Sequence, residues 1–242
     1  MNIIIGRKPV LEAINSGEEI EQVFILHGQK GGIIDVIKIA SKKRGIKCSE
    51  VKKERFLSIT SSHNAQGVAA KKSSIKFYPI EEIISSSKKS KYPLLVILDS
   101  VQDPHNVGAI LRTAECAGTD GIIITKHNSA PINQTVVKTS AGATEHLKIS
   151  IVNNLSQSLR LLKENGFWIV GSSLENSQNY TGLDYKIPIV LIVGNEEKGI
   201  RKLTADSCDF LVQISMKGEI QSLNVSVATG IILFEILRQR RL

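Results

Sequence analysis

The chain has 242 residues, a hydrophobic fraction of 42%, a charged fraction of 22% and a formal net charge of +8, as expected for a soluble globular protein of one or two domains. No apolar run approaches the roughly 18–20 residues of a membrane span, and the N-terminus MNIIIGRKPV lacks the features of a signal peptide. The three cysteines lack C-x-x-C spacing, which predicts a cytoplasmic protein with reduced thiols. The five histidines lack paired-ligand spacing, so no metal site is predicted.

The positive charge is concentrated at the start of the chain. Residues 1–76 hold 14 Lys and Arg against 7 Asp and Glu, whereas residues 77–242 hold 17 against 16. Such an asymmetry favours a nucleic-acid-binding module in the first third of the chain. This excess includes the runs SKKRGIK and VKKERF. The alternative is that these residues form an ordinary solvated face, as most charge runs do.

Residues 1–76 are predicted to form a small α/β domain. RKPVLEAINSG and GGIIDVIKIASKKRG have apolar residues at helical spacing and end on glycine, whereas IEQVFILHG and AQGVAAK have the character of strands. The next segment, 77–92, is centred on SSSKKSK and flanked by prolines. This composition indicates a linker, with room for one helical turn.

From residue 93 onward, strand-like runs alternate with helical segments. The runs LLVILD, GIIIT, FWIVGSS, IVLIVG and FLVQI are apolar throughout, which is typical of parallel strands covered on both faces. Helices are predicted at 106–117, about 131–140, 154–165 and about 224–241. Residues 93–242 are therefore predicted to form an α/β domain with helices on both faces of a parallel sheet.

Polar segments follow three of these strands: DSVQDPHNVGAILRTAECAG, IVGNEEKGI and ISMKGEIQSLNVSVATGIILFE. Ligands of open parallel sheets bind beyond the carboxyl ends of the strands, so these segments are candidates for a site. The chain has no G-x-G-x-x-G, no G-x-x-x-x-G-K-[ST] and no G-x-S-x-G sequence. A Rossmann nucleotide site, a P-loop and a hydrolase nucleophile elbow are therefore not indicated.

The first polar segment carries an arginine that helix capping does not explain. Asp103 and Asn106 suit helix capping, and Pro104 suits a first turn. Arg112 lies on the side of the predicted helix away from its apolar stripe. It is either an inert surface residue or part of a site. The stripe consists of Val107, Ile110, Leu111, Ala114 and Ala117.

Taken together, the three polar segments resemble the signature motifs of the SpoU/TrmH-type RNA ribose 2′-O-methyltransferases, which belong to the SPOUT superfamily. IIGRKPVLEAI and SSHNAQGVAA resemble the family's small substrate-binding domain, which is similar to ribosomal protein L30e. The resemblance implies an RNA-binding domain at 1–76, a linker at 77–92, a methyltransferase domain with a deep trefoil knot at 93–242, and a homodimer. The two-domain layout is most similar to that of bacterial members that methylate a P-loop guanosine of 23S ribosomal RNA.

The same resemblance assigns residues to the site. S-adenosylmethionine would be held mainly by backbone groups of three loops, and the cofactor-binding positions are Ser172, Gly194, Ile214, Met216 and Leu223. The catalytic positions are Asn106, Arg112, Glu196, Ser222 and Asn224.

The implied reaction is an in-line displacement in which a ribose 2′-hydroxyl attacks the methyl group of the sulfonium. The site must hold this poor nucleophile in line and help its proton to leave. A guanidinium stays charged in proteins, so we expect Arg112 to bind the adjacent phosphate, which then helps to accept the proton. His105 is a rival base because its ordinary pKa suits the task.

Two residues depart from the family pattern. Ser215 stands where many relatives have proline, and Glu197 stands where glycine is common; both are expected to affect the shape of the cofactor loops. Alternative functions are methylation of a tRNA guanosine, methylation of the ribosomal adenosine linked to thiostrepton resistance, and a non-catalytic role in RNA binding or ribosome assembly.

Overall fold

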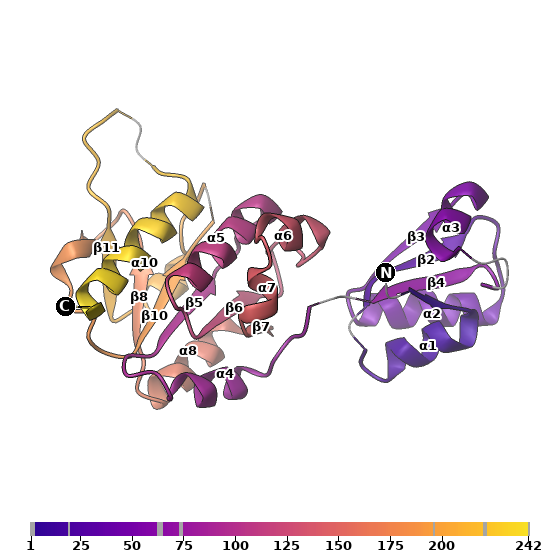
Figure 1. Cartoon of the computed structure of the whole chain (residues 1–242), viewed down its shortest axis with the longest axis horizontal. Helices are drawn as coiled ribbons and strands as arrows, with labels where there is room; N and C mark the ends of the chain where they lie inside the picture. Colours follow the sequence, from indigo (N-terminus) through magenta and orange to yellow (C-terminus); the bar gives the residue numbers. More distant parts are fainter. Residues whose placement is uncertain are drawn as a thin grey trace. The chain divides into compact units, whose positions relative to one another are not determined.

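The chain folds into two compact units, Met1–Lys76 and Phe77–Leu242 (Figure 1). The computed structural model describes residues 3–18, 20–61, 65–72, 75–195, 197–219 and 222–241. Within these ranges, none of the helices has the length and apolar character needed to cross a membrane.

The first unit is a four-stranded sheet in the order β1-β4-β2-β3. Its strands are β1 (Ile3–Ile5), β2 (Ile20–Leu26), β3 (Lys47–Val51) and β4 (Val68–Lys72), and its helices are α1 (Arg7–Asn15), α2 (Gly32–Lys43) and α3 (Lys53–Thr60). Strands β2 and β3 are parallel, whereas the pairs β1–β4 and β2–β4 are antiparallel.

Each face of this sheet has its own apolar core. Val23 and Ile25 pack with α1 and α2 on one face, and Phe24 packs with Phe56 of α3 on the other, because successive side chains of a strand point to opposite faces. The sequence analysis missed β1, β3 and α3. Strand β3 is an edge strand whose Lys47 and Glu50 are exposed, so it carries little apolar signal.

The second unit contains a seven-stranded sheet in the order β7-β6-β5-β10-β8-β11-β9. All strand pairings described in it are parallel, and every residue of β5, β6 and β10 is buried. The predicted parallel sheet is confirmed. Its strands are β5 (Leu94–Leu98), β6 (Gly121–Thr125), β7 (Ile149–Val152), β8 (Trp168–Ser172), β9 (Gln178–Asn179), β10 (Ile189–Val193) and β11 (Phe210–Gln213).

Helices cover both faces of this sheet (Figure 1). On one face, α4 (Ile80–Ser87) and α8 (Leu155–Glu164) bury Ile83 and Leu159 against Ile97 and Ile192 of the sheet. On the other face lie α5 (Pro104–Cys116) and α10 (Val225–Arg241), which pack against each other. The remaining helices are α6 (Gln134–Thr139), α7 (Ala143–His146), the 3-10 helix η1 (Tyr180–Gly182) and α9 (Lys202–Ala205).

The prediction of a linker at 77–92 is wrong. Residues Ile80–Ser87 form α4, whose Ile83 and Ile84 are buried in the core of the second unit, and Tyr78 N–H donates to the carbonyl of Ile149 beside β7. Ile80, Ile83 and Ile84 have helical spacing, but the polar run SSSKKSK beside them lowers the apolar signal of the segment.

Helix α5 begins two residues earlier than predicted. Asp103 is its N-cap, since a side-chain oxygen accepts the N–H of His105 at 2.8 Å, and Pro104 is the first helical residue. Asn106 therefore lies within the first turn and is not the cap. The five residues of the predicted apolar stripe are all buried, and Arg112 is exposed, as the sequence predicts.

Hydrogen bonds from Arg240 hold the end of α10 against the rest of the second unit. Its guanidinium donates to the carbonyls of Tyr185, Tyr92 and Ile187 at 2.9, 2.7 and 2.9 Å. Burial lowers the pKa of Arg240 to about 10, so it remains charged at neutral pH. The trefoil knot implied by the resemblance stays a prediction.

The same helix gives an expected pH dependence. Hydrogen bonds from Arg238 at 2.8 Å to each carboxylate oxygen lower the pKa of Glu235 to about 2. A carboxyl with a depressed pKa stabilises the fold above its unfolded pKa, and this contribution is lost as the pH falls from about 4.5 towards 2. In urea unfolding, the parent should lose more stability between pH 6 and pH 3 than Glu235→Gln does, because only the parent has a carboxylate to protonate at this position. Equal losses would contradict the assignment.

Candidate active site

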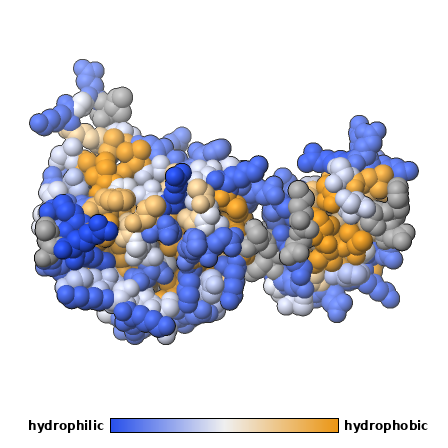
Figure 2. Space-filling view, viewed as in Figure 1, coloured by the Kyte–Doolittle hydropathy of each residue, from blue (hydrophilic) through white to orange (hydrophobic). Residues whose placement is uncertain are grey.

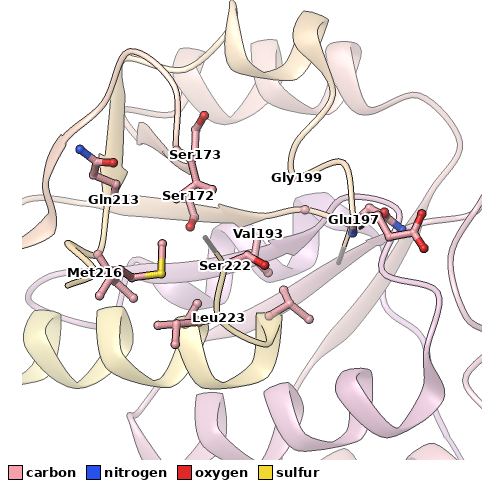
Figure 3. A pocket seen from close by; sticks show the side chains of 15 residues that line it. Ser172, Ser173, Val193, Glu197, Gly199, Gln213, Met216, Ser222 and Leu223 are labelled. Atoms are coloured by element: carbon pink, nitrogen blue, oxygen red, sulfur yellow. Dashed lines mark hydrogen bonds between the residues drawn. The ribbon is translucent and has the colours of Figure 1, made fainter. Parts of the chain in front are cut away.

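A pocket opens at the carboxyl end of the large sheet, where three neighbouring strands stop (Figure 3). β10, β8 and β11 are adjacent in strand order, and the residues that follow them form the walls. Because parallel strands end at the same edge, segments far apart in the sequence meet here. The lining residues are Ser172, Ser173, Leu174, Val193, Gly194, Asn195, Glu197, Gly199, Gln213, Ile214, Met216, Ser222, Leu223, Val225 and Ala228.

The pocket combines apolar side chains with neutral polar groups. Met216 and Leu223 lie on the side next to α10, and Ser172 and Ser173 lie across from them at the end of β8 (Figure 3). Glu197 is the only carboxylate among the described lining residues. Such a lining suits a flat apolar ring and hydroxyl groups better than a phosphate, which needs basic side chains or a glycine-rich phosphate loop.

The loop after β10 is a tight turn that closes on itself. Asn195 and Gly199 exchange two backbone hydrogen bonds, each of 2.9 Å, and Asn195 Oδ1 accepts the N–H groups of Glu197 and Lys198 at 3.0 and 3.2 Å. The left-handed position in this turn is Gly199, with φ of 65°.

A hydrogen bond joins the first and third polar segments. Asn224 Nδ2 donates to Asn106 Oδ1 at 2.9 Å. Asn224 also starts α10, since its Oδ1 accepts the N–H of Ser226 at 2.9 Å. One asparagine therefore sets the position of α10 against the first turn of α5.

Arg112 is placed differently from the pocket residues. It projects from the exposed face of α5, makes no hydrogen bond or ion pair with any residue that the structure describes, and does not line the pocket. His105 is also exposed, on the first turn of the same helix. Because the Arg112 guanidinium is exposed and has no partner among the described residues, it is available to a ligand from solvent.

The structure brings most of the predicted residues together. All five predicted cofactor positions line the pocket, as does Ser222, and Asn106 and Asn224 contact each other beside it. Glu196 lies outside the described residues. The five predicted cofactor positions that line the pocket are Ser172, Gly194, Ile214, Met216 and Leu223.

The sequence analysis missed three groups that shape this edge of the sheet. Asn195 organises the turn after β10, Asp99 is fully buried directly after β5, and Asn179 Nδ2 donates to Ser215 Oγ at 3.0 Å. The signal for Asp99 was its place after the apolar run LLVIL, at a strand end. The bond from Asn179 gives Ser215, at the position of the family proline, a partner in β9.

Comparisons with known proteins agree with this architecture. The sequence model of the "SpoU rRNA Methylase family" matches residues 93–234. A second, "RNA 2'-O ribose methyltransferase substrate binding", matches residues 3–78. Among curated relatives, the "Putative TrmH family tRNA/rRNA methyltransferase" of Staphylococcus saprophyticus is 38% identical over 240 residues, which cover 98% of this chain and 96% of the relative.

Solved structures are also similar, two of them over nearly the whole chain. An AdoMet-bound rRNA methyltransferase from Sinorhizobium meliloti is 29% identical with a TM-score of 0.63, covering 98% of this chain and 86% of that one. The SpoU methyltransferase AviRb from Streptomyces viridochromogenes shares the fold at 21% identity and a TM-score of 0.65, covering 99% and 89%. A TrmH/SpoU tRNA modifying enzyme from A. aeolicus is 36% identical with a TM-score of 0.58, covering 67% and 82%.

Proposed function

The chain belongs to the SpoU family of RNA methyltransferases, and on that premise we propose that it methylates a ribose 2′-hydroxyl of structured RNA, using S-adenosylmethionine. The observation that carries the proposal is the pocket, because residues at the ends of β8, β10 and β11, including those of the second and third polar segments, line it together. The first polar segment is joined to the third by the bond between Asn224 and Asn106. The match of residues 3–78 to a 2′-O-ribose substrate-binding domain supports the ribose as the site of methylation.

The pocket residues fit S-adenosylmethionine. Ile214, Met216 and Leu223 offer an apolar surface for the adenine ring, and Ser172 and the backbone at Gly194 offer hydrogen-bonding groups. Bound there, the cofactor supplies an electrophilic methyl group on a sulfonium. The contribution of the chain is to fix this ligand and to disfavour alternatives such as a phosphate, because the described lining residues include no basic side chain.

Arg112 is proposed to hold the RNA. Its guanidinium, which is exposed and has no partner in the described part of the chain, can bind a phosphate next to the target ribose in a bidentate manner. That phosphate then helps to accept the proton of the 2′-hydroxyl, because Arg112 itself stays protonated. Asn106 and Asn224 hold the start of α5 against that of α10 and so position Arg112, and Ser222 lies at the pocket, where it can contact the ribose. Glu196 is assigned a loop-holding role by the sequence motif alone.

The RNA target proposed is a P-loop guanosine of 23S ribosomal RNA. The two-domain layout and the match to an rRNA methyltransferase across 98% of the chain support a ribosomal target. A transfer RNA is the second candidate, because the curated relatives are named for tRNA or rRNA and one similar structure is a tRNA modifying enzyme. Either RNA would be methylated at the same site of the protein.

A homodimer is proposed as well. Val227 and Phe234 are about half exposed on α10, and Leu223 at its start is 39% exposed. Hydrophobic side chains gather on the surface around α10 (Figure 2), and such patches commonly mark protein interfaces. A second copy of the chain covering this face would explain why α10 leaves large apolar side chains in solvent.

Two measurements test the proposed function. Calorimetry should detect binding of S-adenosylmethionine to the free protein; absence of binding would exclude a catalytic role in favour of an RNA-binding or assembly factor. Mapping of 2′-O-methyl sites in ribosomal and transfer RNA, with cells lacking the protein and cells carrying Arg112→Ala, should show one ribosomal position lost in both. Loss of a tRNA position instead would identify the second candidate.

The first unit should supply salt-dependent RNA affinity. Lys47, Lys52 and Arg55 are exposed and, within the described part of the chain, have no acidic partner, whereas Lys71 pairs with Glu21 at 2.8 Å. Each phosphate contact to single-stranded RNA contributes about 0.7 to the slope of log K against log salt.

Replacing Lys47, Lys52 and Arg55 with glutamine should therefore reduce the slope by about 2. Lys71→Gln is the matched control and should leave the slope unchanged. Binding titrations of a ribosomal RNA fragment at several salt concentrations provide the measurement. If the triple variant keeps the parent slope, these side chains do not contact phosphates.

A further inference from the structure

A buried carboxylate lies beneath the pocket loop. Asp99 directly follows β5 and is 0% exposed. Arg201 Nη2 lies 2.8 Å from its Oδ1, and Thr204 Oγ1 donates to its Oδ2 at 2.9 Å. The backbone N–H of Arg201 donates to the same Oδ2 at 3.4 Å. Asp99 therefore binds the point where the loop after β10 ends and α9 begins.

The beginning of the same loop is bound to Ser100, the residue that follows Asp99. Asn195 Nδ2 donates to the carbonyl of Ser100 at 3.2 Å. Ser100 has a left-handed φ of 66° and is buried, a conformation that costs energy in a residue other than glycine. Its N–H donates to Thr125 Oγ1 at 3.2 Å, which helps to hold it there. Residues 99 and 100 thus bind both ends of the loop 194–201.

Stability alone is a weak reason for this arrangement. An ion pair between the buried Asp99 and the half-exposed Arg201 contributes little net stability, because the carboxylate must leave water and the arginine side chain must be held in one geometry. What a buried, multiply bonded carboxylate supplies is a defined geometry. The loop that it defines places Gly194, Asn195, Glu197 and Gly199 in the pocket wall.

We propose that Asp99 is a positioning residue for the methyl donor: through Arg201 and Thr204 it holds the loop 194–201 in the conformation that forms the pocket. The inference rests on the proposed function, since S-adenosylmethionine is the ligand of that pocket. Asp99 does not line the pocket, and its effect reaches the ligand only through the loop.

Asp209 provides a matched control. Its Oδ1 pairs with Lys163 Nζ at 2.7 Å and its Oδ2 accepts the N–H of Ile169 at 2.8 Å. It therefore binds a cation and a backbone amide, as Asp99 does. Ile169 lies near the start of β8, so Asp209 is at the sheet edge opposite the pocket.

The test compares Asp99→Asn, Arg201→Gln, the double variant and Asp209→Asn with the parent, by calorimetry with S-adenosylmethionine and by amide hydrogen exchange of the protein without ligand. Asp99→Asn should weaken binding at least about tenfold, because the buried charge that binds Arg201 and Thr204 is removed, and should speed exchange locally in 194–204. Arg201→Gln should change both in the same direction, and the double variant should lose little beyond Asp99→Asn. Asp209→Asn should leave affinity within about twofold.

The outcomes separate this inference from the proposed function. If the parent protein binds no S-adenosylmethionine, the proposed function fails, while local exchange in 194–204 still reports whether Asp99 holds the loop. If the parent binds and Asp99→Asn binds equally well, the positioning role is wrong. Faster exchange throughout the second unit would also overturn it, because that pattern indicates general destabilisation. Should Asp99→Asn not fold, Arg201→Gln decides, since its side chain is half exposed.

Discussion

Gly194→Ala is expected to abolish measurable binding of S-adenosylmethionine, a loss of at least about 100-fold. A Cβ atom at position 194 would lie 2.1 Å from the carbonyl carbon of Gly199 and 2.2 Å from the backbone nitrogen of Ile200. Both are backbone atoms, so no side-chain rotation relieves the overlap. The turn between Asn195 and Gly199 would have to open, and the pocket wall would move with it.

Calorimetric titration of the purified variant is the measurement, with thermal unfolding to show that the fold remains. Gly182→Ala is the control, because a Cβ there meets no atom within 4 Å and its φ is not positive. The control should bind as the parent does. If Gly194→Ala is folded and retains affinity within a few fold, the pocket after β10 is not the cofactor site.

Arg112→Ala should reduce turnover by about 10²- to 10³-fold while leaving affinity for S-adenosylmethionine unchanged. This is the usual loss when one group that stabilises developing charge is removed. The side chain is exposed and outside the pocket, so neither folding nor cofactor binding depends on it. Arg112→Lys should be intermediate, because lysine keeps the charge but lacks the planar fork.

His105→Ala separates the two candidate groups. His105 is exposed on the first turn of α5, and its backbone N–H, which bonds to Asp103, survives the substitution. Single-turnover methylation of a ribosomal RNA fragment should therefore proceed in His105→Ala at a rate within about tenfold of the parent. Near-normal turnover in Arg112→Ala together with its loss in His105→Ala would reverse the assignment and make the imidazole the proton acceptor.

Local patterns account for what was predicted well. Continuous apolar runs identified β5, β6 and β10 as buried parallel strands, because strands covered on both faces have no polar side to alternate with. The stripe from Val107 to Ala117 placed Arg112 on the exposed face of α5. The second and third polar segments supply residues that line one pocket, as predicted, since parallel strands end at a common edge. The first segment supplies none of the described lining residues and contacts the third through Asn106.

Elements with weak apolar signals were missed for the opposite reason. Strand β3 has exposed charges on a sheet edge, and β9 has only two residues. Helix α4 was hidden by its serines, and it is defined by the burial of Ile83 and Ile84 against strands that come later in the chain. No local pattern contains that contact.

By itself, the sequence determined the kind of sheet, its covering helices, the family and the loops that carry the site, because these depend on residue type and short-range spacing. Only the tertiary structure decided which groups hold those loops. Asp99 meets Arg201 across 102 residues, and Asn224 meets Asn106 across 118. Such pairs form because β5 and β10 are neighbours in the sheet and α10 packs on α5. A polar side chain acquires a defined partner only once burial and strand order have excluded the others.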